Sequence, residues 1–502
     1  MMGLKFYAVC FALAVIFLLL PSAAAAACVG ASPTWTTTPD QGSVQTCVNK
    51  AVSGDTINVS AGSATWSSSV TFSGKNLIIV GAGIGNTIIS SSSIQADGCN
   101  SPCEITGFTW NMGNYMQISG SIGWRVDHNA FTRATWDYVF FTYGNGPTAT
   151  EGLFDHNTVT YGRVVMYGES NSTGGQYRWS EPLNMGTSHA VYVEDNIVNN
   201  PDGSTGGSYG NFTDGNDGCR LVVRFNSMLG SRFESHGVQG DNNDGCVLFE
   251  YYNNAMAQPA KPNYRPMFIR GGTGVVFHNT SDGKYMNNVI NIDTDRSNED
   301  SIARQVPNWQ FCDGLAQSAN TGGFTFTHPK TVIVDGAGAG GYPCRDQIGR
   351  GQNAFRWVDF GSSVPTQALV PAYFWRNTQP SGEIPVPVSC ETSGDALCNN
   401  QTANIIKQNR DYYLYSASFD GTTGVGEGVL ASRPISCTTG VAYWATDQGE
   451  WNGNHDGADG QLYKCTSTNT WALYYVPFTY PHPLQGNGGG PPPPQKLQGA
   501  AH

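Results

Sequence analysis

Apolar and polar residues alternate in six short segments of the first half of the chain, and each segment ends in an asparagine. These asparagines follow one another at intervals of 28, 39, 30, 28 and 25 residues. Alternation with a period of two predicts β-strands, and its recurrence at this spacing predicts a coil of stacked rungs. The segments are 124–129, 152–157, 191–196, 221–226, 249–254 and 274–279; earlier strands are predicted at 56–59, 77–80 and 87–90.

Alignment of the six segments on their asparagines predicts the direction of each side chain, because successive residues of a strand face opposite sides. The position three residues before the asparagine is always apolar or aromatic and should face inward: Val126, Phe154, Val193, Val223, Tyr251 and Val276. The position two residues before it should face outward: Asp127, Asp155, Glu194, Arg224, Tyr252 and Phe277.

Two interpretations of this outward column stay open. It is either a calcium-binding or sugar-binding strip that ends at Arg224, or an exposed ladder of ion pairs that adds little stability. Arg224 is expected to neutralise Glu194 on the next rung, and Arg125 lies near Asp127 and Asp155. The asparagines are expected to form a hydrogen-bonded stack at a turn. His128 and His156 are expected to be turn or core residues.

The rest of the chain predicts further parts around this coil. Residues 28–60 should form an N-terminal cap with a short helix at 45–51, and residues 61–430 a β-helix whose later part is irregular. Residues 431–485 predict a small, aromatic-rich module whose aromatic side chains either stack on sugars or fill its core. Residues 486–502 predict a disordered tail, since they contain four consecutive prolines.

Composition and cysteine content support an exported all-β protein. The chain has 502 residues with 62 glycines and only 13% charged residues, which favours many turns. A lysine, an apolar run and an alanine stretch make residues 1–27 a predicted signal peptide, and no later stretch is apolar enough for a transmembrane segment. We therefore expect a secreted protein, extracellular or periplasmic, and a monomer. Neighbouring cysteines are predicted to pair as Cys28–Cys47, Cys99–Cys103, Cys219–Cys246, Cys312–Cys344, Cys390–Cys398 and Cys437–Cys465.

The formal net charge of −12 limits the classes of binding partner that we expect. An acidic surface disfavours nucleic acid and suits calcium or a neutral glycan better. A polyuronide could bind only where a local basic groove opposes the global charge.

Two early segments, 54–59 (Gly-Asp-Thr-Ile-Asn-Val) and 78–83 (Ile-Ile-Val-Gly-Ala-Gly), resemble N-terminal rungs of the pectate-lyase-like superfamily. The resemblance covers about residues 45–292 and implies a right-handed parallel β-helix that acts on or binds polysaccharide. Segment 223–237 also resembles one rung of the alginate and chondroitin-sulfate lyases. That family has an arginine where Ser235 stands here and a lysine on the preceding rung, where this chain has none.

Candidate catalytic residues concentrate on three consecutive predicted rungs. In a lyase, His236 would act as the base while Arg224 or Arg270 neutralises a sugar carboxylate. In a hydrolase, Glu194 and Glu250 would form the acid and base pair, two rungs apart. Glu234 belongs to the same polar group.

Further candidates concern substrate and metal. The long interval contains an insertion, 168–187, whose Tyr177, Arg178 and Trp179 are candidate substrate-binding residues, together with Arg232 and Tyr252 on the rungs. Hard oxygen ligands for calcium could come from two loops that precede neighbouring rungs, although turn chemistry explains their composition equally well. These metal candidates are Asp214, Asp217, Asp241 and Asp244.

The leading hypothesis is a secreted carbohydrate-active enzyme, with polysaccharide lyase ahead of glycoside hydrolase. The alternative is a non-catalytic glycan-binding or matrix protein. A spike or adhesin is a third possibility, which the export signal and the lack of any trimerisation signal disfavour.

Overall fold

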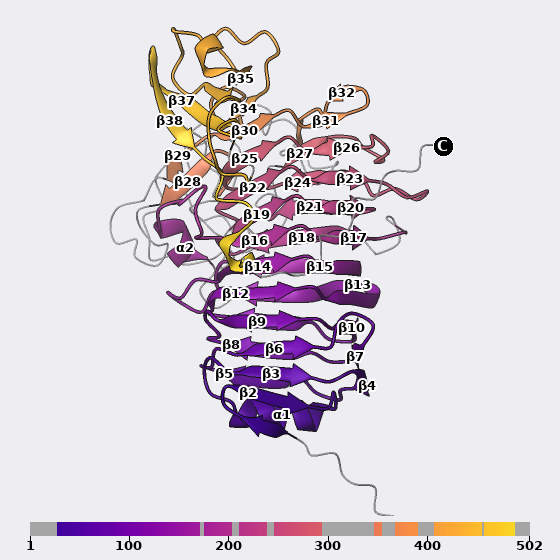
Figure 1. Ribbon diagram of the computed structural model, residues 1–502. Helices are drawn as coiled ribbons and strands as arrows, with labels where there is room; N and C mark the ends of the chain where they lie inside the picture. Colours follow the sequence, from indigo (N-terminus) through magenta and orange to yellow (C-terminus); the bar gives the residue numbers. More distant parts are fainter. Residues whose placement is uncertain are drawn as a thin grey trace, which may run out of the picture.

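The computed structural model describes residues 28–170, 175–202, 210–237, 245–293, 346–353, 367–389, 406–453 and 456–486. Its strands stack rung on rung into a long coil, which begins at α1 (Gln41–Lys50) and ends beside a smaller C-terminal sheet (Figure 1). The predicted all-β fold, a parallel β-helix with an N-terminal cap and a disulfide-bonded C-terminal module, is confirmed.

One long sheet forms one side of the coil, and we call it the first sheet. Its 13 described strands pair in parallel, apart from the antiparallel first pair. The six asparagine segments all lie on it, as predicted. Its strands are β1 (Val29–Ala31), β2 (Thr34–Thr37), β3 (Thr56–Val59), β6 (Ile78–Gly81), β9 (Cys103–Thr106), β12 (Ile122–Asp127), β14 (Glu151–Asp155), β16 (Val191–Glu194), β19 (Arg220–Arg224), β22 (Leu248–Tyr252), β25 (Thr273–Phe277), β30 (Ala372–Trp375) and β34 (Tyr412–Leu414).

The second sheet contains two rows of strands joined by the long strands β13 (Ala130–Tyr143) and β15 (Thr158–Tyr167). The row after the asparagine turn holds β4 (Gly62–Thr65), β7 (Thr87–Ser90), β10 (Thr109–Met112), β17 (Ile197–Asn199), β20 (Ser227–Leu229), β23 (Ala255–Ala257), β26 (Thr280–Ser281) and β31 (Thr378–Gln379). The next row holds β5 (Val70–Ser73), β8 (Ile94–Asp97), β11 (Met116–Ser119), β18 (Asn211–Asn216), β21 (Arg232–Ser235), β24 (Met267–Ile269), β27 (Ile290–Asp293) and β33 (Val388–Ser389). β32 (Gly382–Glu383) pairs with β31, and β28 (Arg350–Asn353) with β29 (Gln367–Leu369).

The asparagines form a continuous hydrogen-bonded stack at the turn between the two sheets, as the spacing predicted. Each amide donates to the side-chain oxygen of the asparagine one rung on; Asn196, for example, donates to Asn226 at 2.9 Å. The residue before each asparagine has a positive φ of 50–57°, and His128 and His156 occupy two of these turn positions. The predicted inward residues are all fully buried in the core of the coil.

Helix α1 closes the N-terminal end of the coil. It begins four residues before the predicted start, because the Asp40 side chain accepts a hydrogen bond from the Ser43 amide and caps the helix. Val44, Cys47 and Val48 are buried against the first rungs, and Cys47 is joined to Cys28.

Four predicted disulfides are present: Cys28–Cys47, Cys99–Cys103, Cys219–Cys246 and Cys437–Cys465. The other two predicted pairs lie outside the described residues. No described helix is both long and apolar enough to cross a membrane.

The C-terminal sheet contains β35 (Val425–Gly428), β36 (Ala442–Ala445), β37 (Gln461–Ser467) and β38 (Thr470–Tyr475), with short 3-10 helices at η4 (Leu430–Ser432) and η5 (Pro483–Gln485). Its aromatic residues Trp444, Trp451 and Tyr475 are buried in one cluster with outward residues of the first sheet, among them Tyr252 and Phe277. These aromatic side chains therefore fill an interface with the coil. From β38 the chain runs down over the first sheet, the yellow segment of Figure 1.

Candidate active site on the second sheet

The predicted site residues do not converge on one open groove. Glu194, Arg224, Tyr252 and Glu250 lie on the outer face of the first sheet, whereas Arg232, His236 and Arg270 lie on the second sheet or directly after its strands. The two groups therefore lie on different sides of the coil.

The first group is buried under the C-terminal segment. Arg224 is ion-paired with Glu194 at 2.5 Å, as predicted, but it also donates to the backbone carbonyls of Phe478 and Thr479 at 2.6 and 2.9 Å. Arg224 and Glu194 are both fully buried. Burial raises the pKa of Glu194, although the charge of Arg224 opposes the shift. The outward column is thus neither an exposed ion-pair ladder nor an open strip at these rungs.

Glu250 and Tyr252 complete this contact. Glu250 accepts hydrogen bonds from the Tyr475 hydroxyl at 2.6 Å and from the Gly186 amide at 2.8 Å. Tyr252 stacks on Phe277 and accepts a hydrogen bond from Arg224. A substrate cannot reach these side chains while the segment is in place, so this geometry gives no support to Glu194 and Glu250 as a hydrolytic pair.

The insertion also places its candidate residues in packing contacts. Trp179 of α2 (Gln176–Ser180) is buried and donates to the Gly245 carbonyl at 2.8 Å. Arg178 is buried and donates to the Pro147 carbonyl at 2.7 Å. Both contacts attach the insertion to the coil, and only Tyr177 of the three is half-buried.

The second group forms one polar cluster on neighbouring rungs of the second sheet. Asp214 on β18 is in register with Glu234 on β21, and Phe268 on β24 follows on the next rung. Phe233 faces the core, so its neighbours Arg232 and Glu234 face outward.

Arginine side chains hold the two carboxylates of this cluster. Glu234 is ion-paired with Arg232 at 3.1 Å and also with Arg270. Asp214 is ion-paired with Arg163 of β15 at 3.2 Å.

Three guanidinium groups lie 4.3–5.3 Å from the centroid of the Phe268 ring. They belong to Arg232, Arg265 and Arg270. With Arg163 the cluster contains four arginines, and three of them are ion-paired with its two carboxylates. A protein of net charge −12 therefore carries a local basic patch here, although Arg232, Glu234, His236 and Arg270 are themselves buried, at most 7% exposed.

His236 directly follows β21, and its imidazole contacts the backbone of the next residue. Its Nδ1 lies 3.1 Å from the Gly237 carbonyl, which can only accept a hydrogen bond. The proton of neutral His236 therefore sits on Nδ1, and Nε2 carries the lone pair. That nitrogen is the one that could take a proton or bind a metal.

A row of aromatic rings continues from the cluster onto the rungs toward the N-terminal end. Adjacent rings lie with centroids 5.0–5.8 Å apart, and all are half-buried. Arg163 lies 4.4 Å above one of them, Tyr138, and so links the row to the cluster. The row, which we call the aromatic platform, contains Tyr115, Tyr138, Phe141, Tyr143 and Tyr167.

Three residues of the cluster could also hold a cation. The ligand atoms of Asp214, Glu234 and His236 all lie within 4.8 Å of one another. Asp214 Oδ1 is buried and has no hydrogen-bond partner, which fits a metal ligand. A set that includes an imidazole suits a transition metal better than calcium.

Of the other predicted metal ligands, only Asp217 lies among the described residues, and it is not part of this set. Asp217 lies beyond the end of β18 near Glu169, and Asp241 and Asp244 lie outside the described residues.

The sequence placed Arg232, Glu234, His236 and Arg270 in one group, but Arg163, Arg265 and the aromatic platform were not predicted. The alternation of Phe141 and Tyr143 with inward Phe140 and Thr142 does indicate that these two rings face outward. The register between rungs could not be derived from it, because β13 and β15 span both rows of the sheet and their pairing contains register shifts.

We compared the chain with protein-family models, curated proteins and solved structures, and none of them matches it.

Proposed function

We propose that the chain is an exported carbohydrate-active enzyme that cleaves an acidic polysaccharide by β-elimination on the outer face of the second sheet. The observation that carries this proposal is the basic patch, four arginines against two carboxylates beside an imidazole, next to the aromatic platform. The four disulfides fit a protein that works outside a reducing compartment.

Each part of the cluster has a role in this reaction. Sugar rings would stack on the aromatic platform, and this stacking would orient the polysaccharide along the coil. Arg232, Arg270 and Glu234 are buried, so substrate binding would have to open the cluster and release both arginines from Glu234. The two arginines would then neutralise the uronate carboxylate and so make the adjacent C–H proton more acidic. His236 Nε2 would accept that proton, since arginine stays charged and is a poor base. The C4–C5 double bond would form as the C4–O glycosidic bond breaks, and the leaving oxygen would take a proton from water.

A divalent cation at Asp214, Glu234 and His236 would offer another way to neutralise the carboxylate. In that case Arg232 and Arg270 would have to release Glu234, and His236 would bind the metal instead of acting as the base. Chelation therefore distinguishes the two arrangements: the arginine-based site keeps its activity in EDTA, and the metal-based site loses it.

The test is incubation with a panel of uronate polysaccharides and neutral glycans, followed by ultraviolet detection of unsaturated products. We expect His236→Ala to lower the rate about 100-fold or more. His189→Ala is the matched control, because His189 is exposed and lies near Glu151, away from the cluster. Glycan binding without unsaturated products or new reducing ends would favour a binding protein and reject the enzyme.

A further inference from the structure

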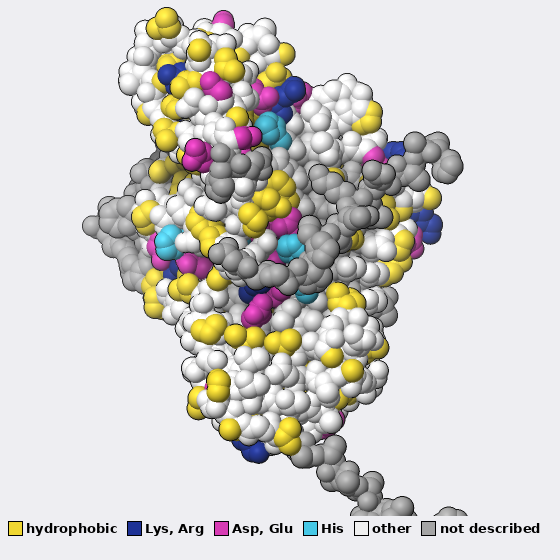
Figure 2. Space-filling view, viewed as in Figure 1, with side chains coloured by type: hydrophobic (Ala, Val, Ile, Leu, Met, Phe, Trp, Pro, Cys, Tyr) yellow, Lys and Arg dark blue, Asp and Glu magenta, His cyan; other side chains and the backbone are white. Residues whose placement is uncertain are grey.

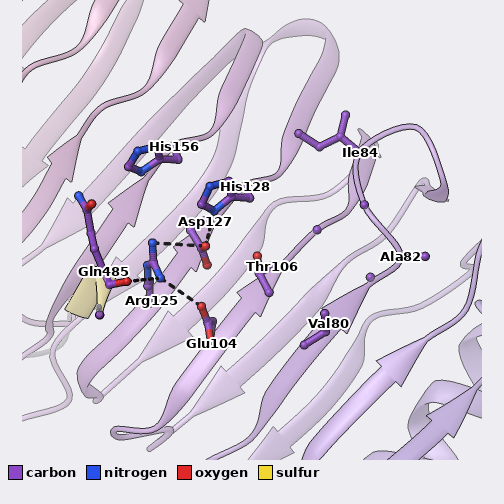
Figure 3. Close-up of a pocket in the computed structure, with 14 residues that line it drawn as sticks. Val80, Ala82, Ile84, Glu104, Thr106, Arg125, Asp127, His128, His156 and Gln485 are labelled. Atoms are coloured by element: carbon purple, nitrogen blue, oxygen red, sulfur yellow. Dashed lines mark hydrogen bonds and ion pairs between the residues drawn. The ribbon is translucent and has the colours of Figure 1, made fainter. Parts of the chain in front are cut away.

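The structure contains a second polar site, on the outer face of the first sheet beside the last described residues of the C-terminal segment. There the outward residues of β6, β9 and β12 line a groove of about 700 Å³, and Gln485 and Gly486 form one edge (Figure 3). We call it the Arg125 groove. Acidic and histidine side chains gather midway along this face of the molecule (Figure 2).

Arg125 is the central cation of the groove, but Asp155 takes most of its hydrogen bonds. The guanidinium donates twice to Asp155, at 2.9 and 2.7 Å. Its nearest approaches to Glu104 and Asp127 are both 3.4 Å. Three carboxyl groups therefore share one guanidinium, and only Asp155 is well satisfied.

Asp127 leaves one oxygen without a donor. The residue is 3% exposed and lines the groove. Its Oδ2 lies 2.6 Å from His128 Nδ1, but buried Oδ1 has no hydrogen-bond partner. An unsatisfied buried carboxylate oxygen is costly unless a proton or a cation meets it.

Glu104 is the neighbour that can supply such a proton. Burial raises its pKa to about 7, and the charges of Asp127 and Asp155 add to the effect while Arg125 opposes it. The rings of His128 and His156 stack beside this group at 5.0 Å, and the pKa of His156 is raised through its contact with Asp155. An additional positive charge close to Glu104 and Asp127 would therefore be stabilised.

We propose that the Arg125 groove binds the ammonium group of an amino sugar in a glycan, with Glu104 and Asp127 as its two carboxylate acceptors. The ammonium has three N–H donors, which can meet Asp127 Oδ1 and the Glu104 carboxylate together.

The rest of the groove suits a sugar ring better than a simple metal ion. Val80, Ala82 and half-exposed Ile84 offer an apolar surface for a ring face, and Thr106 and Gln485 offer partners for hydroxyl groups. The volume lies within the range of small-ligand pockets, roughly 300–1,000 Å³, and leaves room for more than one ring. No metal-ligand set of three side chains occurs here among the described residues.

This inference does not depend on the cleavage proposed for the second sheet. The two sites have opposite local charge: arginines outnumber carboxylates on the second sheet, whereas carboxyl groups outnumber Arg125 in the groove. One would take an anionic sugar and the other a cationic sugar.

Calorimetry with a β-linked glucosamine trimer tests the proposal, and its N-acetylated counterpart is the control with the same rings and no charge. The full chain should bind the glucosamine trimer about tenfold or more tightly, the effect of a hydrogen bond between charged groups. Below pH 7 binding should release a proton, because the ammonium displaces the one held by Glu104, whose pKa is about 7. Titration in buffers of different ionisation enthalpy measures that release.

The double variant Glu104→Gln with Asp127→Asn should lose the preference for the charged trimer. The double variant Glu450→Gln with Asp456→Asn, at two exposed carboxylates of the C-terminal module, is the charge-matched control. Unchanged melting of the double variant, and unchanged uronide cleavage if wild type has it, shows that the fold persists. Equal affinity for both trimers, or a preference that survives the double substitution, overturns the proposal.

Discussion

Asp217 carries a buried carboxyl group whose two oxygens both lack a hydrogen-bond partner. Burial raises its pKa to about 8, and the nearby charge of Glu169 adds to the shift. The folded state thus binds this proton more tightly than the unfolded chain does. Its contribution to stability is full at acid pH and is lost as the pH rises from about 4 toward 8.

We therefore expect Asp217→Asn to raise the melting temperature above pH 8 and to change it little near pH 4, where the carboxyl group is largely protonated in the folded protein. Thermal unfolding across this pH range measures the effect. If Asp217→Asn instead lowered stability at alkaline pH in the presence of calcium, a bound cation would replace the proton as the partner of Asp217. That result would restore the metal-binding role predicted for it from the sequence.

At the residue scale, the sequence predicted well which face of the sheet each side chain lies on, but it predicted poorly whether that side chain is exposed to solvent. The alternation placed Glu194 and Arg224 on the outer face and paired them correctly, because a strand's period of two fixes the side of each residue. It could not show that Phe478 and Thr479, more than 250 residues later, cover that face. Burial by a distant segment leaves no periodic signal in the covered strand.

At the scale of elements, the asparagine stack is the feature that sequence predicted most completely. Asn226 is buried and donates to the backbone of Val193 and Arg224 and to the side chain of Asn254. It also accepts hydrogen bonds from the backbone and side chain of Asn196. A single residue thus satisfies polar groups on three consecutive rungs.

Asn226→Ala should destabilise these rungs by about 3 kcal/mol or more, since it leaves several buried donors and acceptors unpaired at about 1–3 kcal/mol each. Hydrogen–deuterium exchange should show faster opening of β16, β19 and β22, and urea unfolding should shift in the same direction. Asn111→Ala is the control, since Asn111 is exposed on β10 and its side chain makes a long contact with Ser90. Equal effects of the two substitutions would argue against the stack as a source of stability.

At the scale of the whole molecule, the C-terminal segment decides which parts of the first sheet are open. Its described part covers the outer face of this sheet from β14 upward, and the Arg125 groove lies beside the last described residues, Gln485 and Gly486. The covering contacts are polar as well as aromatic: Glu194 also accepts from the His482 amide and the Gln485 side chain. Three of the catalytic candidates from the sequence, Glu194, Arg224 and Glu250, therefore hold the C-terminal part of the chain against the first sheet.

Arg224→Ala separates the two roles proposed for that residue. Removing one partner of a buried ion pair leaves Glu194 uncompensated and costs about 3–5 kcal/mol. Because Arg224 also holds two carbonyls of the C-terminal segment, much of that cost should loosen the segment, so limited proteolysis should cut it sooner. Arg376→Ala is the control, since Arg376 is exposed and pairs at the surface with Glu383 and Glu427. Uronide cleavage should keep its wild-type rate, because His236 and Arg270 lie on the other sheet. A fall in rate as large as that of His236→Ala, with the segment still protected, would instead make Arg224 part of the catalytic centre.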